Sequence, residues 1–264
     1  MSPDPALREG VIAVARAAAA EITGVYALDF EVSSKADASP VTAADLAAHG
    51  VIVAGLAALT PDIPVLSEES ADACFAARHA WTRYWLVDPL DGTREFVKKN
   101  GEFSVNIALV DAGEAVFGVI QQPVGGVVWH GGAACGAYRR DAEGERAIST
   151  RRPPAPPLVI AASRSHRDAR TDAVIARFPG AEVLGLGSSL KFCRIAEGLL
   201  DLYPRFGPTS EWDTAAGQAI LEGAGGTLLD PRGRPFRYNQ RETLLNGDFV
   251  ASGDPALAHA ILAG

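Results

Sequence analysis

The stretch Trp85–Thr93 reads WLVDPLDGT and places two carboxylates, Asp88 and Asp91, at the end of an apolar run. Two like charges beside a buried strand are unfavourable unless something compensates them. One explanation is an acidic surface turn of type I, which Asp88 begins and in which Pro89 takes the second position. The other is a site on which further acids converge. The rest of the chain has to decide between the two.

The composition is that of a globular protein. The chain has 264 residues, of which 48% are hydrophobic and 21% are charged, enough for one large domain or two lobes. No apolar run approaches the roughly 18–20 residues of a membrane span, and the N-terminal MSPDPALREG lacks the pattern of a secretory signal. We therefore expect a cytoplasmic protein without a transmembrane segment, and peripheral association with the inner membrane stays open. The three cysteines are widely separated, which suggests neither a disulfide framework nor a zinc site.

The charge balance limits the class of partner. A formal net charge of −8 and a pI near 5.2 argue against nucleic-acid binding, which needs a basic face. The same field repels a phosphate ester, so a small phosphorylated substrate would need cations gathered at the site. The sequence is compatible with a homodimer but does not determine one.

Hydrophobic periodicity and turn formers predict the elements. Four prolines in Arg151–Pro157 exclude a helix interior or a central strand, so we place a lobe boundary there, between 1–150 and 151–264. The patterns predict a layered α/β fold. Its expected helices are 7–26, from near 42 to 59, 171–178, 188–200 and 214–222, and its expected strands are 65–66, 84–87, 103–109, 116–120, 127–130, 136–139, 158–161, near 183, 201–203 and 227–229.

Further acids stand beside expected elements. Glu68 and Glu69 follow the strand Val65-Leu66, and Asp213 stands where a helix is expected to start. Considered one at a time, these acids have ordinary explanations: Asp213 could be the N-cap of its helix, and Glu68 and Glu69 could be exposed to solvent. Converging, these carboxylates would bind divalent cations, and Mg²⁺ prefers oxygen ligands. The helix start expected at Gly92-Thr93 would offer backbone N–H groups to a phosphate.

Four blocks of the sequence carry a family resemblance. They are PVTAAD at 40–45, LSEE at 66–69, DPLDGT at 88–93 and WDTAAG at 212–217. In this order they resemble the signatures of the inositol monophosphatase-like family. The resemblance implies an αβαβα sandwich and a Mg²⁺-dependent, lithium-sensitive phosphatase.

The resemblance also implies a set of metal ligands. Glu68, Asp88 and the Leu90 carbonyl would hold one Mg²⁺, and Asp88, Asp91 and Asp213 a second. A third ion would lie near Glu68 and Glu69. The N-terminal lobe would thus carry most ligands, while the C-terminal lobe would carry Asp213 and the substrate contacts.

Catalytic roles are likewise implied for Asp45, Thr93 and Glu69, and Asp45 and Thr93 would orient the attacking water. A structural alternative exists for Asp45, because Thr42-x-x-Asp45 has the spacing of a capping box. Both roles are compatible, since a cap could place the carboxylate at the site.

The segments between these blocks indicate the substrate. They are 98–109, 163–166, 187–198 and 202–217. They resemble the bacterial 3′(2′),5′-bisphosphate nucleotidases of the family, which remove the 3′-phosphate of adenosine 3′,5′-bisphosphate (PAP) in sulfate assimilation. The sulfated analogue PAPS is a further candidate substrate. Inositol monophosphatase or fructose-1,6-bisphosphatase activity is the alternative.

A second phosphate needs further cationic or dipolar groups. We expect Ser188, Lys191 and Arg205 to bind it, with His166 nearby, because Gly187-Ser188 would offer free N–H groups at a helix start. Lys191 and Arg205 could instead be exposed solubilising charges, and His166 a surface residue. The substrate would also contact residues of the metal blocks, namely Glu68, Leu90, Asp91, Gly92, Thr93 and Asp213.

Two other classes of function have some support in the sequence. Ser188-x-x-Lys191 matches the SxxK nucleophile motif of penicillin-binding enzymes, but the partner motifs SDN and KTG are missing from the sequence. A non-catalytic regulator on the same fold would be expected to lose at least one metal carboxylate. The sequence retains all of them.

Overall fold

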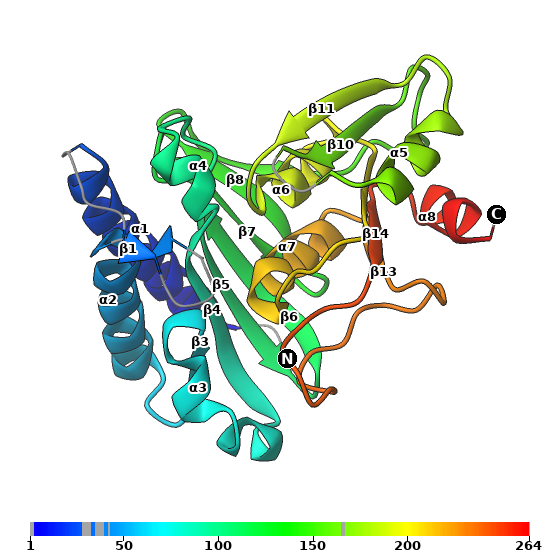
Figure 1. Cartoon of the computed structure of the whole chain (residues 1–264). Helices are drawn as coiled ribbons and strands as arrows, with labels where there is room; N and C mark the ends of the chain where they lie inside the picture. Colours follow the sequence, from blue (N-terminus) through cyan, green and yellow to red (C-terminus); the bar gives the residue numbers. More distant parts are fainter. Residues whose placement is uncertain (1–2, 28–32, 35–39, 42, 165–166, 264) are drawn as a thin grey trace.

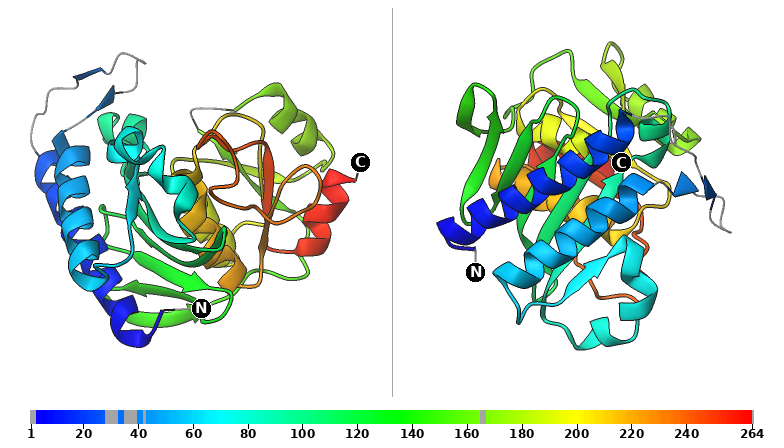
Figure 2. Two further views of the ribbon diagram at one scale, coloured as in Figure 1. Left: turned by 90° about the horizontal axis from the view of Figure 1, so that it is seen from below. Right: turned by 90° about the vertical axis from the view of Figure 1, so that its left-hand side faces the viewer.

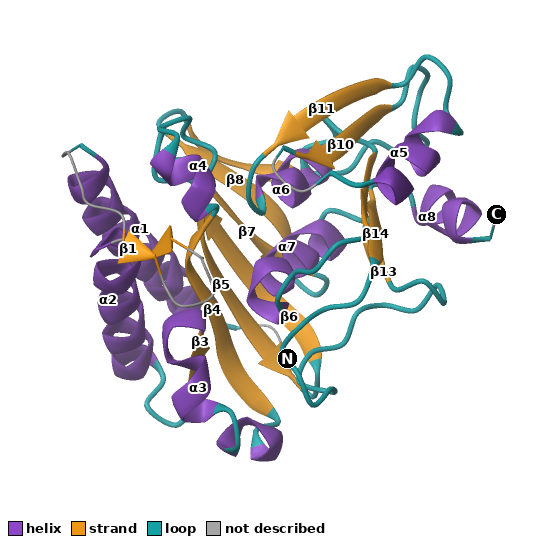
Figure 3. Ribbon diagram, viewed as in Figure 1, coloured by secondary structure: helices purple, strands orange, loops and turns teal. Residues whose placement is uncertain are grey.

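The computed structural model describes residues 3–27, 33–34, 40–41, 43–164 and 167–263 (Figure 1). Its two large sheets are formed by successive parts of the chain (Figure 3). The first has seven strands in the order β3-β4-β5-β6-β7-β8-β9, and only β3 and β4 pair in parallel. These strands are β3 Val65–Ser67, β4 Arg83–Asp91, β5 Ser104–Asp111, β6 Glu114–Gln121, β7 Val128–Gly132, β8 Gly136–Asp141 and β9 Gly144–Ile148.

The second sheet has five strands in the order β11-β10-β12-β14-β13. Its parallel pairs are β10 with β11 and β10 with β12, while β14 runs antiparallel to both of its neighbours. These strands are β10 Val159–Ser163, β11 Glu182–Leu186, β12 Leu202–Arg205, β13 Thr227–Leu229 and β14 Phe249–Ser252. A two-stranded ribbon of β1 Ser33–Ser34 and β2 Pro40–Val41 lies apart from both sheets.

Helices and sheets alternate in five layers (Figure 2). Helices α1 and α2 cover one face of the seven-stranded sheet, α6 and α7 fill the space between the sheets, and α5 and α8 cover the outer face of the five-stranded sheet. This confirms the predicted αβαβα sandwich. The helices are α1 Pro5–Tyr26, α2 Ala43–Leu59, α3 Ala71–Cys74, α4 Thr93–Val97, α5 Ala169–Ala176, α6 Leu190–Ala196, α7 Glu211–Gly223 and α8 Pro255–Leu262, with 3₁₀ turns at Glu68–Ser70 and Ala77–Ala80.

The layering explains why β4 is apolar at every position from Tyr84 to Val87. Trp85 and Val87 pack with the cluster under α1 and α2, whereas Tyr84 and Leu86 pack with the cluster around α6 and α7. Successive side chains of a strand point to opposite faces, and both faces of β4 are covered. A continuous apolar run is therefore what this strand needs.

The segment 151–157 lies between the two sheets in sequence. Helix α7 nevertheless packs on strands of the seven-stranded sheet, so the second half of the chain completes the core of the first. The division into two lobes that fold separately stays a prediction. In the described part of the chain, no helix is both long and apolar enough to span a bilayer.

Some elements differ from the predicted ones. Helix α6 begins at Leu190 and ends at Ala196, and α7 begins at Glu211, three residues earlier than expected. Strands β9 and β14 and helix α8 had not been predicted. Strand β9 is an edge strand of the seven-stranded sheet, and its residues are mostly exposed and polar. It therefore lacks the alternation of apolar residues from which strands are predicted.

Candidate active site

The acidic stretch lies in a strand rather than in a surface turn. Strand β4 continues to Asp91, and its register with β5 shifts between Asp88, opposite Asn106, and Asp91, opposite Ser104. The predicted type I turn is therefore wrong. Pro89 has no N–H to donate and lies where the ladder is interrupted, a usual place for proline in a sheet. In a regular strand, residues at this odd spacing would point to opposite faces, and the extra residue of the bulge changes that alternation.

Three carboxylates meet at this bulge. Oxygen atoms of Asp88, Asp91 and Asp213 all lie within 4.8 Å of one another. Asp213 comes from the first turn of α7, where its Oδ2 accepts a hydrogen bond from the backbone N of Ser210 at 2.8 Å. The N-cap is thus Ser210 and not Asp213, which corrects one predicted alternative. Asp213 caps its helix from the third position and still joins the acidic cluster.

The cluster is unfavourable without a compensating charge. Asp88 is 2% exposed, and burial, together with the charges of Glu68 and Asp91, raises its pKa well above the usual range. Burial and the charge of Asp91 raise the pKa of Asp213 in the same direction. A cation reverses both effects, and a set made only of carboxylate oxygens suits a hard divalent ion. The residues present fit a metal centre.

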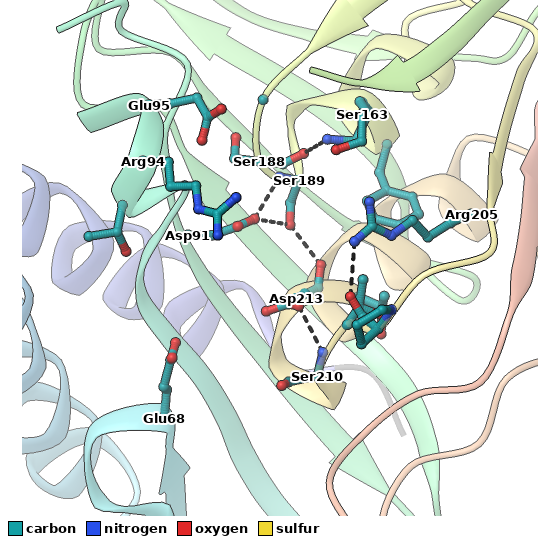
Figure 4. Close-up of a pocket in the computed structure, with 18 of the residues that line it drawn as sticks. Glu68, Asp91, Arg94, Glu95, Ser163, Ser188, Ser189, Arg205, Ser210 and Asp213 are labelled. Carbon is teal, nitrogen blue, oxygen red and sulfur yellow. Dashed lines mark hydrogen bonds between the residues drawn. The ribbon is translucent and has the colours of Figure 1, made fainter. Parts of the chain in front are cut away.

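The cluster opens into a cavity of about 340 Å³ (Figure 4). Helix α2, the 3₁₀ turn Glu68–Ser70, the junction of β4 with α4, the start of α6, strand β12 and the start of α7 all contribute to its wall. The predicted site residues that line it are Asp45, Glu68, Glu69, Asp91, Gly92, Thr93, Ser188, Lys191, Arg205 and Asp213. Asp88 and Leu90 lie behind this wall, at 2% and 1% exposure. His166, and Thr42 of the predicted capping box, fall outside the described residues.

The two basic side chains expected to bind phosphate, Lys191 and Arg205, both line the cavity. Lys191 and Arg205 are only 4% and 5% exposed, so the alternative of exposed solubilising charges is wrong. Lys191 Nζ donates to the carbonyls of Leu186 at 3.2 Å and Ser188 at 2.5 Å, and an Arg205 Nη donates to the Pro208 carbonyl at 2.9 Å. Burial lowers the pKa of Lys191 to about 8.

The comparisons with known proteins agree with this geometry. A sequence model of the inositol monophosphatase family matches residues 6–263. The chain belongs to this family. The 3′(2′),5′-bisphosphate nucleotidase CysQ of Escherichia coli (strain K12) is 50% identical over 244 residues, which cover 92% of this chain and 98% of that protein. The CysQ nucleotidase of Haemophilus influenzae is 35% identical over 246 residues, 92% of this chain and 91% of that protein.

Solved structures of inositol monophosphatase family members have the same fold as this chain. The crystal structure of CysQ from Bacteroides thetaiotaomicron matches with a TM-score of 0.82 and 38% identity, covering 92% of this chain and 96% of that one. An inositol monophosphatase of Thermotoga maritima matches with a TM-score of 0.79, 96% of this chain and 93% of that one, at 22% identity. The second likeness concerns the fold alone.

One expected anion site of this inositol monophosphatase family member is built differently. Helix α6 begins after Ser189, and the Gly187 N–H, expected to be free, donates to Glu102 Oε2 at 2.8 Å. The expectation of a free amide at Gly187 is wrong, because Glu102, in the loop before β5, already accepts from it. Ser188 lines the cavity and has a left-handed backbone, with φ at 44°.

Sequence analysis missed two polar residues that contact the cluster. Ser189 N and Ser189 Oγ both donate to Asp91 Oδ2 at 2.6 Å, and Asn106 Nδ2 donates to the same oxygen at 3.2 Å. Asn106 interrupts an otherwise apolar stretch of β5, and this interruption was the available signal in the sequence. The structure places Asn106 directly opposite Asp88. Ser189 had no such signal beside the equally polar Ser188.

Proposed function

We propose that this chain is a 3′(2′),5′-bisphosphate nucleotidase that hydrolyses the 3′-phosphate of PAP to give AMP and phosphate. The observation that carries the proposal is 50% identity, over 92% of the chain, to a protein of that name. The chain is accordingly a phosphoric monoester hydrolase. PAPS is a second candidate substrate, and the reaction would serve sulfate assimilation.

We propose Mg²⁺ as the cofactor, in two or three ions. Asp88, Asp91 and Asp213 would hold it, together with Glu68 and the Leu90 carbonyl. Their support is the convergence of three carboxylates within 4.8 Å and the pKa values that burial raises. When bound, the cations would stabilise the negative charge that develops at the phosphate and the leaving oxygen.

The remaining residues would bind and orient the substrate. Lys191 has three N–H donors, of which two are taken by carbonyls, so one is left for a phosphate oxygen. Arg205 adds a second buried positive charge on the same wall of the cavity. A substrate with two phosphates fits this arrangement, since one phosphate would face the acidic cluster and the other the two cations.

Asp45 and Thr93 would orient the attacking water, with Glu69 nearby. Asp45 is buried in the first turn of α2 and lines the cavity. Thr93 follows the bulge, and its hydroxyl donates to the Leu90 carbonyl at 3.5 Å. A water that donates to an Asp45 oxygen and to Thr93 Oγ1 would be held at the cluster, and the Asp45 carboxylate would accept the proton that this water gives up on attack.

The test offers the purified protein PAP, PAPS, inositol 1-phosphate and fructose-1,6-bisphosphate, with Mg²⁺ and then with EDTA. We expect the highest kcat/KM with PAP and loss of activity in EDTA. A preference for either sugar phosphate would replace the proposed substrate. Activity that persists in EDTA would refute the metal dependence. The cytoplasmic location and the homodimer stay predictions, which fractionation and light scattering test.

A further inference from the structure

One carboxylate oxygen of the cluster is unusually well supplied with donors. Asp91 Oδ2 accepts from Ser189 N, Ser189 Oγ and Asn106 Nδ2 at 2.6, 2.6 and 3.2 Å. Three donors occupy the acceptor capacity of that oxygen, so the other oxygen of Asp91 is the one left for a cation. We propose that Ser189 and Asn106 are positioning residues that fix the orientation of Asp91 for metal binding. The inference rests on the proposed metal-dependent function.

The Ser189 hydroxyl also joins two separate parts of the acidic cluster. Its Oγ lies 2.7 Å from the backbone carbonyl of Asp213 as well as 2.6 Å from Asp91 Oδ2 (Figure 4). A hydroxyl has one proton, which serves one of these acceptors at a time, and the close approach holds both to the same side chain. Strand β4 and helix α7 are thereby tied together at the point where their acids meet.

Asn106 orients this hydroxyl and is itself oriented. Its Nδ2 donates to Ser189 Oγ at 2.9 Å in addition to Asp91, and its Oδ1 accepts from Ser104 Oγ at 3.1 Å. The Asp91 carboxylate only accepts hydrogen bonds, so it defines which way the amide faces, and both Nδ2 protons point to the cluster. Ser189 and Asn106 are 2% and 1% exposed, and hydrogen bonds to a carboxylate are strong in such surroundings.

A purely structural role is the competing explanation, because the Ser189 N–H bond also fastens the start of α6. The variant Ser189→Ala separates the two roles: it keeps the backbone bond and removes only the hydroxyl. The matched control is Ser252→Ala. Ser252 is fully buried in β14, and its hydroxyl donates to the Asp201 carbonyl at 2.9 Å, at a residue that does not line the cavity.

The experiment measures Mg²⁺ and Mn²⁺ affinity of the purified proteins by calorimetry without substrate. Partners of this kind typically contribute about 10- to 100-fold to metal affinity, and we expect a loss of that size in Ser189→Ala. The Mg²⁺ concentration for half-maximal activity should rise in parallel, with KM for substrate unchanged at saturating Mg²⁺. Ser252→Ala should keep the wild-type affinity even where its melting temperature falls. Ser189→Thr, which keeps the hydroxyl, should regain most of the affinity.

The outcomes distinguish this inference from the proposed function. Wild-type affinity in folded Ser189→Ala would overturn the positioning role and leave the metal site standing. Absence of divalent-cation binding by the wild type would overturn the metal-dependent function, and this inference with it. If Ser189→Ala does not fold, Asn106→Ala decides in the same way, because it removes one donor from Asp91 and one from Ser189.

Discussion

The Asp91 carboxylate has two properties that matter for the site. Its negative charge would attract a cation, and one of its oxygens is held in place by hydrogen bonds from neighbouring donors. The substitution Asp91→Asn keeps the shape and removes the charge. We expect activity to fall by more than the roughly 10- to 100-fold attributed to indirect partners, because a direct ligand is lost. Steady-state kinetics with PAP and a melting curve check this result. Near-normal turnover would contradict the role of Asp91 as a ligand.

Lys191 gives the site a defined pH dependence. Its pKa is lowered from 10.5 to about 8 because burial disfavours the charged form. The free enzyme therefore carries the charge below about pH 8 and loses it above. We expect the ratio of kcat/KM between wild type and Lys191→Met to be greatest near pH 7 and to fall towards one by pH 9 to 10, since kcat/KM reports ionisation of the free enzyme.

The ratio cancels pH effects that arise at the acidic cluster, because both proteins share that cluster. A ratio that stays constant from pH 7 to 9 would show that the Lys191 charge takes no part in binding. The sequence predicted Lys191 as a contact but left its burial open. The carbonyls of Leu186 and Ser188 that hold Nζ belong to the backbone, and no pattern of side chains indicates them.

Among the elements, α6 and α7 approach each other at a glycine. A Cβ on Gly217 of α7 would fall inside van der Waals contact with the Phe192 ring of α6. Gly217→Ala should destabilise the fold by about 1–3 kcal/mol through overpacking. Gly217→Ala should also weaken metal binding. An added methyl group would push α6 away from α7, and Ser189 would then lie farther from Asp213. Urea unfolding and calorimetry measure the two effects.

Gly50→Ala is the matched control, because Gly50 lies exposed in α2 and an added Cβ would meet nothing within 4 Å. The same exchange there should stabilise the protein by roughly 0.5–1 kcal/mol, since alanine favours the helix. If Gly217→Ala stabilised the protein as much as Gly50→Ala, the close approach of α6 and α7 would not be what requires glycine at position 217.

The elements themselves were predictable where side chains carry the pattern. Helix α1, strand β5 and the helix after Gly92 follow from spacing of apolar residues and from turn formers. The bulge in β4 does not, because Pro89 after Asp88 is equally typical of a turn. Only the pairing with Asn106 and Ser104 on β5, a long-range contact, decides between the two.

At the scale of the whole molecule, the cavity depends on both halves of the chain. Asp91 lies on the first sheet and Asp213 on α7, which connects β12 to β13 of the second sheet. Helix α7 brings the two acids together by packing on the first sheet. Motif resemblance predicted that these acids converge. It did not reveal Ser189 and Asn106, because their role depends on where distant elements meet.

The acidic cluster also links the stability of the whole fold to pH and metal. The pKa of Asp88 is raised above its usual 3.8 in the metal-free fold, so the folded protein binds more protons than the unfolded chain above that pH. Its contribution to stability is therefore lost as pH rises from about 4 through the raised pKa. Asp88→Asn removes the buried charge. We expect the metal-free variant to melt above the metal-free wild type at pH 8, with a smaller difference near pH 4.

Mg²⁺ should reverse this order, because a ligand that binds only the folded state raises the melting temperature. We expect millimolar Mg²⁺ to raise the melting temperature of the wild type at pH 8 and to have little effect on Asp88→Asn. Asp62→Asn is the control, since Asp62 is exposed and does not line the cavity, and it should respond to Mg²⁺ as the wild type does. Thermal unfolding in EDTA and in Mg²⁺ measures all three proteins. A metal-free Asp88→Asn that melts below the wild type at pH 8 would show that charge repulsion in the cluster is not the dominant cost, because Asn keeps an Oδ1 that can accept the hydrogen bond from Leu90 N.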